Sequence, residues 1–378
     1  MRFALLIHSY FPYGGQQRDF MRIARECLNR GHEVIVYAFR WEGMVPEQIE
    51  YVPVPIKGLT RLARYRYFSE WVAAQIQAQP VDAVIGFTKM PGLDIYYAAD
   101  PCFVEKAITQ RGAYYQYTPR YFHFKDFEEQ VFGANCATKI LTLSELQRQD
   151  YLKHYPDCGN RMLNLPPGIS PDRQVLERNL DWRAQLRKDF EISDEQLLLL
   201  QVGSGFRVKG VDRSLKAIAA LPPRLQRRVH FLVIGQDRAT RFRWQAQRLG
   251  LERQVSFLSG RDDIPHFFAG ADMLLHPAYE ESAGYVLLEA AIAGLPVLTT
   301  ATCGYADYVK EAEAGEICAQ PFSQSELNSR LTSMLEKLGS ASWSDNGLRY
   351  GRRPELYTMP QKAVDYIEQI ASTKESPV

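Results

Sequence analysis

The sequence predicts an α/β protein built from two doubly wound domains of parallel sheet, and three observations support this prediction. The chain has 378 residues, a length that suits two domains better than one. Short apolar runs, typical of strands buried on both faces, alternate with helical patterns along both halves. The stretch from Leu165 to Gly168, with two prolines, has the composition of a linker. Such alternation implies right-handed βαβ units, which bind ligands at the carboxyl ends of their strands.

The first half is predicted to begin with a buried strand. The apolar run from Phe3 to Ile7 stops at His8 with no small-residue cleavage site behind it, so it fits a strand better than a signal peptide. A glycine-containing turn then leads into a helical pattern from Gln17 to Leu28, and Gly31 stands in the usual place of a C-terminal glycine. The further strands expected in this half are Val34 to Phe39, Asp82 to Phe87 and Lys139 to Leu143.

The second half repeats the scheme. Helices are expected from Val211, over Ala239 to Leu249 and from Gly284, and an amphipathic helix over about Pro360 to Ile370 ends the pattern. We therefore expect one domain at 1–166, joined by the C-terminal segment 358–378, and a second at 167–357. The strands expected in the second half are Leu197 to Val202, Val229 to Ile234, Val255 to Leu258, Met273 to His276 and Pro296 to Thr300.

Composition excludes several classes of protein. The formal net charge is +1 at pH 7, so no global charge favours nucleic acid as a partner. No apolar run of about 18 residues is present, and we expect no membrane span. The six cysteines are scattered without the close spacing of zinc or redox sites, so reduced thiols in a cytoplasmic protein are expected.

The strongest motif is a pair of glutamates eight positions apart, Glu281 and Glu289, set around the expected start of a helix. Gly284 between them permits close approach of a ligand to the backbone. The amides of Ala283, Gly284 and Tyr285 would point out of the helix N-terminus, a natural site for a diphosphate. Glu289 would then accept hydrogen bonds from ribose hydroxyls, and Glu281 from sugar hydroxyls. Either glutamate alone would more often be a surface or capping residue, but the His-Pro before the pair and the Ala-Gly-Leu-Pro after it favour a functional site.

Lys209 follows the first strand of the second half, where a cation would neutralise a diphosphate leaving group. The alternative is a solvated lysine, the commoner fate of this residue type. Gly203 and Gly205 before it lack the third glycine of a dinucleotide fingerprint and are followed by no Walker A lysine, so a dehydrogenase is poorly supported. Asp-x-Asp and HExxH motifs and metal-ligand clusters are also absent from the sequence. We therefore expect neither a metal nor a cofactor besides a nucleotide-sugar co-substrate.

The first half offers weaker candidates. Gly14 and Gly15, with Tyr13, form a turn before the first helix, and bare backbone there would come close to a phosphate or sugar. Asp19, about one turn into the helix, would face the same side. An ordinary turn with a solvent-facing aspartate is the alternative. Asp100 stands before a proline and after an expected helix, where a turn-forming aspartate is equally plausible.

These motifs resemble the retaining glycosyltransferase family 4, which has the GT-B fold. The Glu-x7-Glu element is specific to the superfamily, and other stretches are similar to the narrower group of lipopolysaccharide core glucosyltransferases. The resemblance covers nearly the whole chain. It implies two Rossmann-like domains facing each other across a cleft, the first binding the acceptor and the second the nucleotide-sugar. The stretches that carry it are Phe11 to Asp19, Gly86 to Asp94, Ala98 to Asp100, Pro166 to Arg173 and Lys209 to Ser214.

The resemblance also implies roles for single residues. It brings Gly15 close to the donor, Asp19 near the reacting sugar and Asp100 to the acceptor side. It further implies that Arg173 reaches the cleft, and that backbone groups of the loop containing Arg261 read the base. Helix capping by an aspartate of that loop is compatible with this role.

One position departs from the pattern of the group. An arginine usually stands immediately before the phosphate-binding lysine, and here Val208 occupies that place. Arg207, one residue earlier, is the expected replacement.

Two stretches bear on a membrane partner. The segment from Lys57 to Phe68 holds four cations and no acid, and the segment from Phe103 to Phe132 is dense in tyrosine and phenylalanine. Aromatic and cationic side chains together suit a membrane interface with anionic headgroups, and proteins of the group resemble monotopic membrane enzymes in this region. A solvated basic helix and a partly buried aromatic cluster are the alternative. The candidate acceptor and membrane residues are Lys57, Arg61, Arg64, Arg66, Arg111, Arg120 and Lys125.

The resemblance implies transfer of a hexose, with glucose favoured, from a UDP-sugar to a heptose of the lipopolysaccharide inner core. The configuration would be retained, giving an α-linkage, at the cytoplasmic face of the inner membrane. Two alternatives stay open. The same fold would also serve another donor, such as galactose, an amino sugar or a GDP-sugar, or another acceptor. A non-catalytic nucleotide-sugar-binding protein at the membrane is the alternative from a different class, although the presence of both glutamates and Lys209 argues against it.

Overall fold

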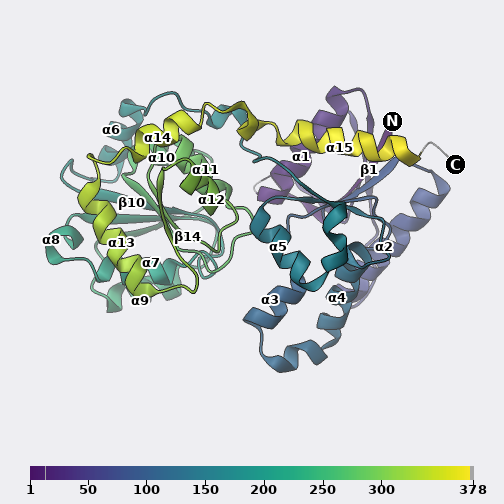
Figure 1. The fold of residues 1–378 in the computed structure, drawn as a ribbon, viewed down its shortest axis with the longest axis horizontal. Coiled ribbons are helices and arrows are strands. Elements are labelled where there is room, and N and C mark those ends of the chain that lie inside the picture. The colour runs from purple at the N-terminus through teal and green to yellow at the C-terminus, as the bar shows by residue number, and fades with distance from the viewer. Residues whose placement is uncertain (13, 375–378) are drawn as a thin grey trace. The chain divides into compact units, whose positions relative to one another are not determined.

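The computed structural model describes residues 1–12 and 14–374, and these form two compact α/β units (Figure 1). The first unit comprises Met1–Gly168 and the described part of Thr358–Val378, and the second comprises Ile169–Tyr357. Tyr13 of the predicted glycine turn and residues 375–378 of the predicted C-terminal segment lie outside the described residues.

The first unit is built around a seven-stranded parallel sheet with the strand order β5-β3-β1-β6-β7-β8-β9. The central strand β1 pairs with β3 on one side and β6 on the other, and its residues from Phe3 to Leu6 are fully buried. A fully apolar strand is expected in this position because helices cover both faces of a parallel sheet. The strands are β1 Arg2–Leu6, β3 Glu33–Ala38, β5 Ile49–Pro53, β6 Ala83–Gly86, β7 Ile95–Tyr97, β8 Lys139–Thr142 and β9 Met162–Asn164, with a separate pair of β2 Ser9–Tyr10 and β4 Arg40–Trp41.

The helices of the first unit include one from the far end of the chain. Helix α15 packs beside α1 (Figure 1), and the Arg30 guanidinium joins the two through Nη1, 2.9 Å from Asp365 and 2.8 Å from Glu368. Among the described residues, no helix combines the length and the apolar composition needed to cross a bilayer. The helices are α1 Gly15–Asn29, α2 Arg61–Ala78, α3 Phe103–Gln110, α4 Pro119–Phe132, α5 Glu145–His154 and α15 Met359–Lys374, with 3-10 turns at Ala113–Tyr117 and Pro156–Arg161.

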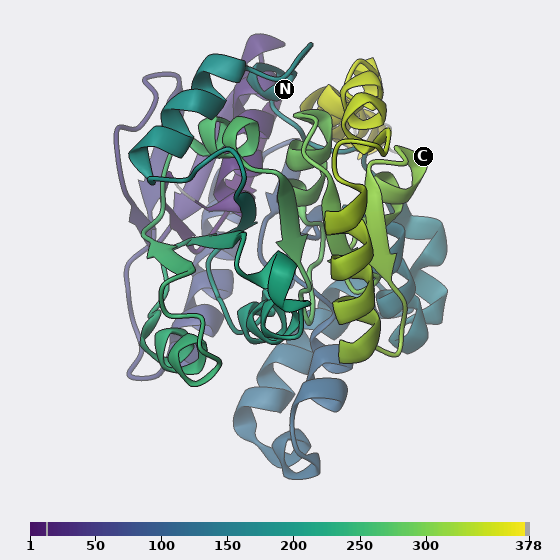
Figure 2. The same cartoon turned by 90° about the vertical axis from the view of Figure 1, so that its left-hand side faces the viewer.

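The second unit contains a six-stranded parallel sheet with the order β12-β11-β10-β13-β14-β15. Helices α7, α9 and α13 pack together in one layer, and α11, α12 and α14 pack together in another (Figures 1 and 2). The strands are β10 Leu197–Val202, β11 Val229–Ile234, β12 Val255–Leu258, β13 Met273–His276, β14 Val297–Thr300 and β15 Gly315–Cys318. The helices are α6 Leu180–Asp189, α7 Val211–Ala219, α8 Pro223–Gln226, α9 Thr240–Arg248, α10 Ile264–Gly270, α11 Tyr285–Ile292, α12 Ala306–Glu311, α13 Gln324–Lys337 and α14 Trp343–Tyr350, with 3-10 turns at Pro171–Arg173 and Pro354–Tyr357.

The predicted fold class is confirmed, and one local prediction is wrong. Asp100 follows a strand, β7, rather than a helix. Strand β7 has only three residues, of which Tyr96 and Tyr97 are fully buried, and so short a run shows no period that separates strand from helix. Strands β5, β9 and β15, which lie at the edges of their sheets, were also not predicted from the sequence.

Candidate active site

Glu281 stands in the loop between β13 and α11, at the carboxyl edge of the second sheet. Backbone hydrogen bonds fix this loop: the Glu281 amide donates to the Thr302 carbonyl at 3.2 Å, and the Glu281 carbonyl accepts from the Gly304 amide at 2.9 Å. The Tyr305 amide donates to the Ala283 carbonyl at 2.7 Å. The loop is therefore held along its length by the segment after β14. Glu281 itself is half-buried, so the interpretation as a surface glutamate is wrong.

The side chain of Glu281 forms an ion pair with Lys209, which reaches it from the loop after β10. Strands β10 and β13 are neighbours in the sheet, and this brings together two residues that are 72 positions apart. Lys209 is also partly buried, and its methylene chain lies over Gly203, where an added Cβ would stand 3.4 Å from Lys209 Cε. The alternative of a solvated lysine therefore does not describe this side chain.

The charge state of Glu281 follows from its neighbours. Burial alone would raise the pKa of Glu281, but His276 and Lys209 together lower that pKa to about 2. His276, the last residue of β13, is completely buried, and burial lowers its pKa, which disfavours the protonated imidazole. Its Nε2 lies 3.5 Å from Glu281 Oε2. The cation beside the carboxylate is thus Lys209, and Glu281 stays ionised across the neutral range.

In the sequence, His276 stands out only as a residue that flanks the motif, and its place beside Glu281 was not predicted. Both of its ring nitrogens lack a hydrogen-bond partner within the described part of the chain. The available signal was its position at the last residue of a buried apolar strand, where a polar side chain points to the ligand-binding edge.

Helix α11 begins with a glycine in the left-handed conformation. Gly284 has φ 96° and ψ 49°, and an added Cβ would lie 3.1 Å from Glu281 Cγ. Only glycine adopts this positive φ without strain and leaves room for the Glu281 side chain. Gly284 therefore allows the Glu281 loop to turn directly into the first turn of the helix. Ala283 is buried at this turn, and Tyr285 and the half-buried Glu289 stand one helical turn apart, as predicted.

The predicted arginines of the donor site differ in how they are engaged. Arg261 donates two hydrogen bonds to Asp263, at 2.7 and 2.6 Å, and Arg173 pairs with its neighbour Asp172 at 3.3 Å. Asp263 is the N-cap residue of α10, but its side chain serves Arg261 and makes no cap hydrogen bond. Arg207 is exposed, and its guanidinium makes no hydrogen bond or ion pair with any described residue. The structure therefore joins Lys209 to Glu281 and leaves these three arginines outside that pair.

In the first unit, Asp19 is buried rather than solvent-facing. Its Oδ2 accepts a hydrogen bond of 2.8 Å from the hydroxyl of Tyr97 on β7, and its Oδ1 lies 3.8 Å from Arg22 Nη1. The alternative of a solvent-exposed aspartate in an ordinary turn is therefore wrong. A buried carboxylate at the start of α1, bonded to the strand beside it, is a fixed group at the ligand-binding edge of this sheet.

The two glycines at the start of α1 differ in whether the fold requires glycine at their position. Gly14 is the N-cap residue, and a Cβ added there would lie 1.8 Å from Gln17 Oε1. A Cβ added at Gly15 would meet no protein atom within 4 Å, and Gly15 does not have a positive φ. Packing thus restricts Gly14, whereas the fold itself does not require glycine at position 15.

Asp100 is exposed, but its backbone is fixed. Its carbonyl accepts hydrogen bonds from Gln147 Nε2 at 3.0 Å and from the Tyr151 hydroxyl at 2.9 Å. Lys89 holds the next residue by donating to the Pro101 carbonyl at 2.8 Å, and pairs with the buried Glu128 of α4 at 2.5 Å. The exposed residue Asp100 is therefore held in a rigid turn after β7.

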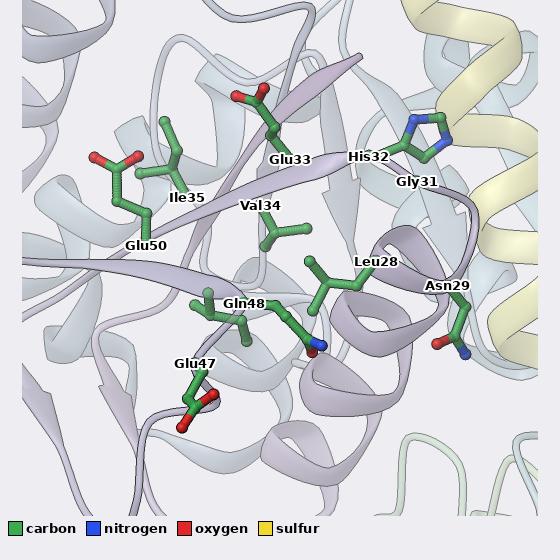
Figure 3. Close-up of a pocket in the computed structure, with 11 residues that line it drawn as sticks. Leu28, Asn29, Gly31, His32, Glu33, Val34, Ile35, Glu47, Gln48 and Glu50 are labelled. Atoms are coloured by element: carbon green, nitrogen blue, oxygen red, sulfur yellow. The ribbon is translucent and has the colours of Figure 1, made fainter.

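A pocket of about 530 Å³ in the first unit contains none of the predicted site residues (Figure 3). It lies at the amino ends of β3 and β5, the sheet edge opposite the one where Asp19 and Asp100 stand. Its lining includes Glu33, Glu47 and Glu50, so it is acidic. Across residues 1–12 and 14–374, no group of three or more His, Cys, Asp or Glu side chains is placed to hold a metal ion.

Two parallel-sheet domains of this kind, with charged groups at the carboxyl edges of their strands, are the arrangement found in glycosyltransferases of the GT-B fold. Sequence comparison agrees: the model of glycosyltransferase family 4 matches residues 13–173, and that of the group 1 glycosyl transferases matches residues 183–347. The chain belongs to the family of the lipopolysaccharide glucosyltransferase WaaG. WaaG of Escherichia coli (strain K12) is 46% identical over 365 residues, which span 96% of this chain and 98% of that protein.

Solved structures give the same picture. The crystal structure of WaaG, a glycosyltransferase involved in lipopolysaccharide biosynthesis, matches with a TM-score of 0.89 over 97% of this chain and 99% of its own. Anabaena Alr3699/HepE in complex with UDP-glucose matches with a TM-score of 0.74 over 98% and 100% of the two chains, at 18% identity. The second likeness shows the shared fold alone.

Proposed function

We propose that the protein transfers glucose from UDP-glucose to a heptose of the lipopolysaccharide inner core, with retention of configuration and formation of an α-linkage. The observation that carries the proposal is the 46% identity to the E. coli lipopolysaccharide glucosyltransferase over 96% of the chain. The two units are proposed to divide the work, with the acceptor bound by the first and the nucleotide-sugar by the second.

The donor would be bound around the Lys209–Glu281 pair. We propose that Lys209 leaves Glu281 for the diphosphate when UDP-glucose binds, and that Glu281 then accepts hydrogen bonds from the glucose hydroxyls. The amides at the start of α11, around Gly284, suit the diphosphate because the first turn of a helix leaves its N–H groups without intrahelical acceptors. Glu289 would accept from the ribose. Arg207, exposed and unpaired among the described residues, would supply the second cation.

The reaction proposed is a same-face displacement. The bond between the glucose anomeric carbon and the β-phosphate oxygen breaks, a bond from that carbon to the heptose oxygen forms, and the departing phosphate oxygen takes the proton of the heptose hydroxyl. Positive charge develops on the glucose ring, and fixed carboxylates stabilise such charge. Asp19 and Asp100 are the candidates in the first unit for orienting the acceptor. We propose that Gly15 allows close approach of the donor to the backbone. The fold of the first unit gives no other reason for a glycine at this position, because a Cβ added there would meet no protein atom within 4 Å.

The proposal is tested by measuring UDP release from a panel of UDP-hexoses, with and without truncated lipopolysaccharide that exposes inner-core heptose. We expect acceptor-dependent release from UDP-glucose, and a product with one added α-linked hexose by mass spectrometry and NMR. Preference for another donor would replace glucose in the proposal. Tight UDP binding without release from any donor would instead support the non-catalytic binding protein.

We further propose that the first unit binds the cytoplasmic face of the inner membrane through α2 and the α3-to-α4 segment. This segment projects from the sheet (Figures 1 and 2). Leu59 and Tyr114 are almost fully exposed, and Tyr117 and Phe122 are more than half exposed. Lys125 pairs with Glu129, whereas the other six predicted cations pair with no carboxylate in the described part of the chain. Exposed aromatic rings beside unpaired cations suit an anionic interface. Those six are Lys57, Arg61, Arg64, Arg66, Arg111 and Arg120.

Reversing two of these charges should weaken membrane binding. In an Arg111→Glu/Arg120→Glu variant we expect partitioning onto phosphatidylglycerol-containing vesicles to fall at least about thirtyfold, since each cation near an anionic surface contributes roughly 1 kcal/mol. Vesicle co-sedimentation at low salt measures it. The matched control is Arg241→Glu/Arg248→Glu on the exposed face of α9 in the second unit, which should keep wild-type binding. Equal binding by both variants and the wild type would exclude this surface.

A further inference from the structure

We propose that Arg213 is a positioning residue that fixes Glu281 by holding the beginning of the loop on which Glu281 stands. Arg213 belongs to the first turn of α7, sixty-eight positions before Glu281 in sequence. The inference rests on the proposed function in one respect, the assignment of Glu281 to the donor sugar. Its structural part, the control of the loop by Arg213, stands on contacts within the second unit alone.

The guanidinium of Arg213 is enclosed between two aromatic rings. Its Cζ lies 3.5 Å from the centroid of the Tyr279 ring and 3.6 Å from that of the Phe322 ring. Tyr279 is two residues before Glu281, and Phe322 follows β15, so the two rings come from separate parts of the sheet edge. Arg213 is only 9% exposed. Cation–π contacts at this distance are strongest where water is excluded.

The same guanidinium bonds the backbone of the Glu281 loop. Arg213 Nη1 donates to the Pro277 carbonyl at 3.2 Å and to the Ala278 carbonyl at 3.0 Å. The Ala278 carbonyl also accepts from the hydroxyls of Thr300 and Thr302, each at 2.8 Å. This carbonyl is thus fixed from both sides, by α7 and by the end of β14 with the residues after it.

No carboxylate of the described residues lies within ion-pair distance of this buried cation. A buried charge without a counter-ion is costly unless other groups solvate it. Here the two ring faces and the two loop carbonyls take the place of water. The charge therefore favours close packing of α7 against Tyr279 and the Pro277–Ala278 segment. Separating them would expose the aromatic rings to water and leave the two carbonyls without their hydrogen-bond donor.

The enclosure also connects the two sides of the Lys209–Glu281 pair. The Tyr279 hydroxyl donates to Asp212 Oδ2 at 2.9 Å, and the Tyr279 amide donates to the Val208 carbonyl at 2.8 Å. A Cβ added at Gly210 would lie 2.0 Å from the Pro277 oxygen, so the backbone after Lys209 runs directly against the loop that leads to Glu281. A displacement at Tyr279 would therefore move Lys209 and Glu281 relative to each other.

Arginine suits this position in a way that lysine does not. Its planar group offers two faces for the rings and edges for the carbonyls at the same time, whereas an ammonium is a compact point charge. The Arg213→Lys variant should therefore lose function although it keeps the positive charge. If charge alone mattered at this position, lysine would preserve function.

The test compares Arg213→Met and Arg213→Lys with Arg243→Met. Arg243 is an exposed arginine of α9 that lies 5.3 Å from the Phe257 ring and does not touch the Glu281 loop. We expect kcat/KM for UDP-glucose to fall about a hundredfold in both Arg213 variants, because displacements of about 1 Å cost that much. Affinity for UDP should fall less than affinity for UDP-glucose. Hydrogen exchange of the amides from Tyr279 to Gly284 should rise, and Arg243→Met should change none of these.

Wild-type kinetics together with unchanged loop exchange in Arg213→Met would overturn the proposal. If that variant does not fold, Phe322→Leu removes one ring of the enclosure and should give the same pattern with a smaller effect, of about tenfold in kcat/KM. Loop exchange needs no turnover. A wild-type protein that fails to transfer glucose would therefore contradict the proposed function and leave the positioning inference to be decided by exchange alone.

Discussion

Replacing Glu281 by glutamine is expected to lower the rate of hexose transfer by about tenfold to a hundredfold and to leave the protein folded. The backbone of residue 281, bonded to Thr302 and Gly304, is unchanged by the substitution. The amide keeps the shape of the carboxylate but loses its charge, and hydrogen bonds to a charged group contribute about 1.5–3 kcal/mol. The charge matters most as the sugar becomes cationic, so the loss should appear in kcat more than in KM.

The measurement is steady-state UDP release with UDP-glucose and heptose acceptor, beside thermal unfolding of the same samples. Glu252→Gln, at an exposed carboxylate of the same unit, is the control and should match the wild type. The melting temperature of the Glu281 variant should fall by only a few degrees, since the amide still accepts a hydrogen bond from Lys209. Transfer at the wild-type rate in a folded Glu281→Gln protein would remove Glu281 from the site.

The fold was predictable because buried parallel strands leave a strong sequence signal. Four strands of the second unit, such as β10 and β11, begin and end at the predicted residues, since each is a mostly apolar run preceded by a polar residue. Strand β15 was missed because Glu316 interrupts its apolar character, and β7 because three residues show no period. Local patterns therefore identify central strands better than short or peripheral ones.

Single candidate residues could be proposed from the sequence, but the contacts between them could not. Lys209 and Glu281 are both recognisable from their positions after apolar strands. Their ion pair depends on β13 lying beside β10, although β11 and β12 come between them in the chain, and strand order is a tertiary property. Arg213 and His276 show the same limit. Their roles come from burial and from partners remote in sequence, and neither is visible in a local pattern.

Replacing Lys209 by methionine should reduce transfer by about tenfold to a hundredfold and weaken UDP binding at least about tenfold. Methionine keeps the apolar stem over Gly203 and removes the cation proposed to stabilise the departing diphosphate, where a charge-assisted hydrogen bond contributes about 1.5–3 kcal/mol. Lys209→Arg is the comparison that restores the charge, and should recover part of both losses. Calorimetric titration with UDP and steady-state kinetics measure the two effects separately.

The same variant should change the pH dependence, and this separates the role of Lys209 toward Glu281 from its role toward phosphate. Burial raises the pKa of Glu281, and His276 and Lys209 bring it down to about 2. Without the Lys209 cation this pKa rises, so Glu281 becomes protonated at a higher pH and the acid limb of kcat/KM should move upward. A folded Lys209→Met protein with reduced rate and an unmoved acid limb would show that Lys209 acts on the diphosphate alone. Wild-type UDP affinity with a shifted limb would instead restrict its role to Glu281.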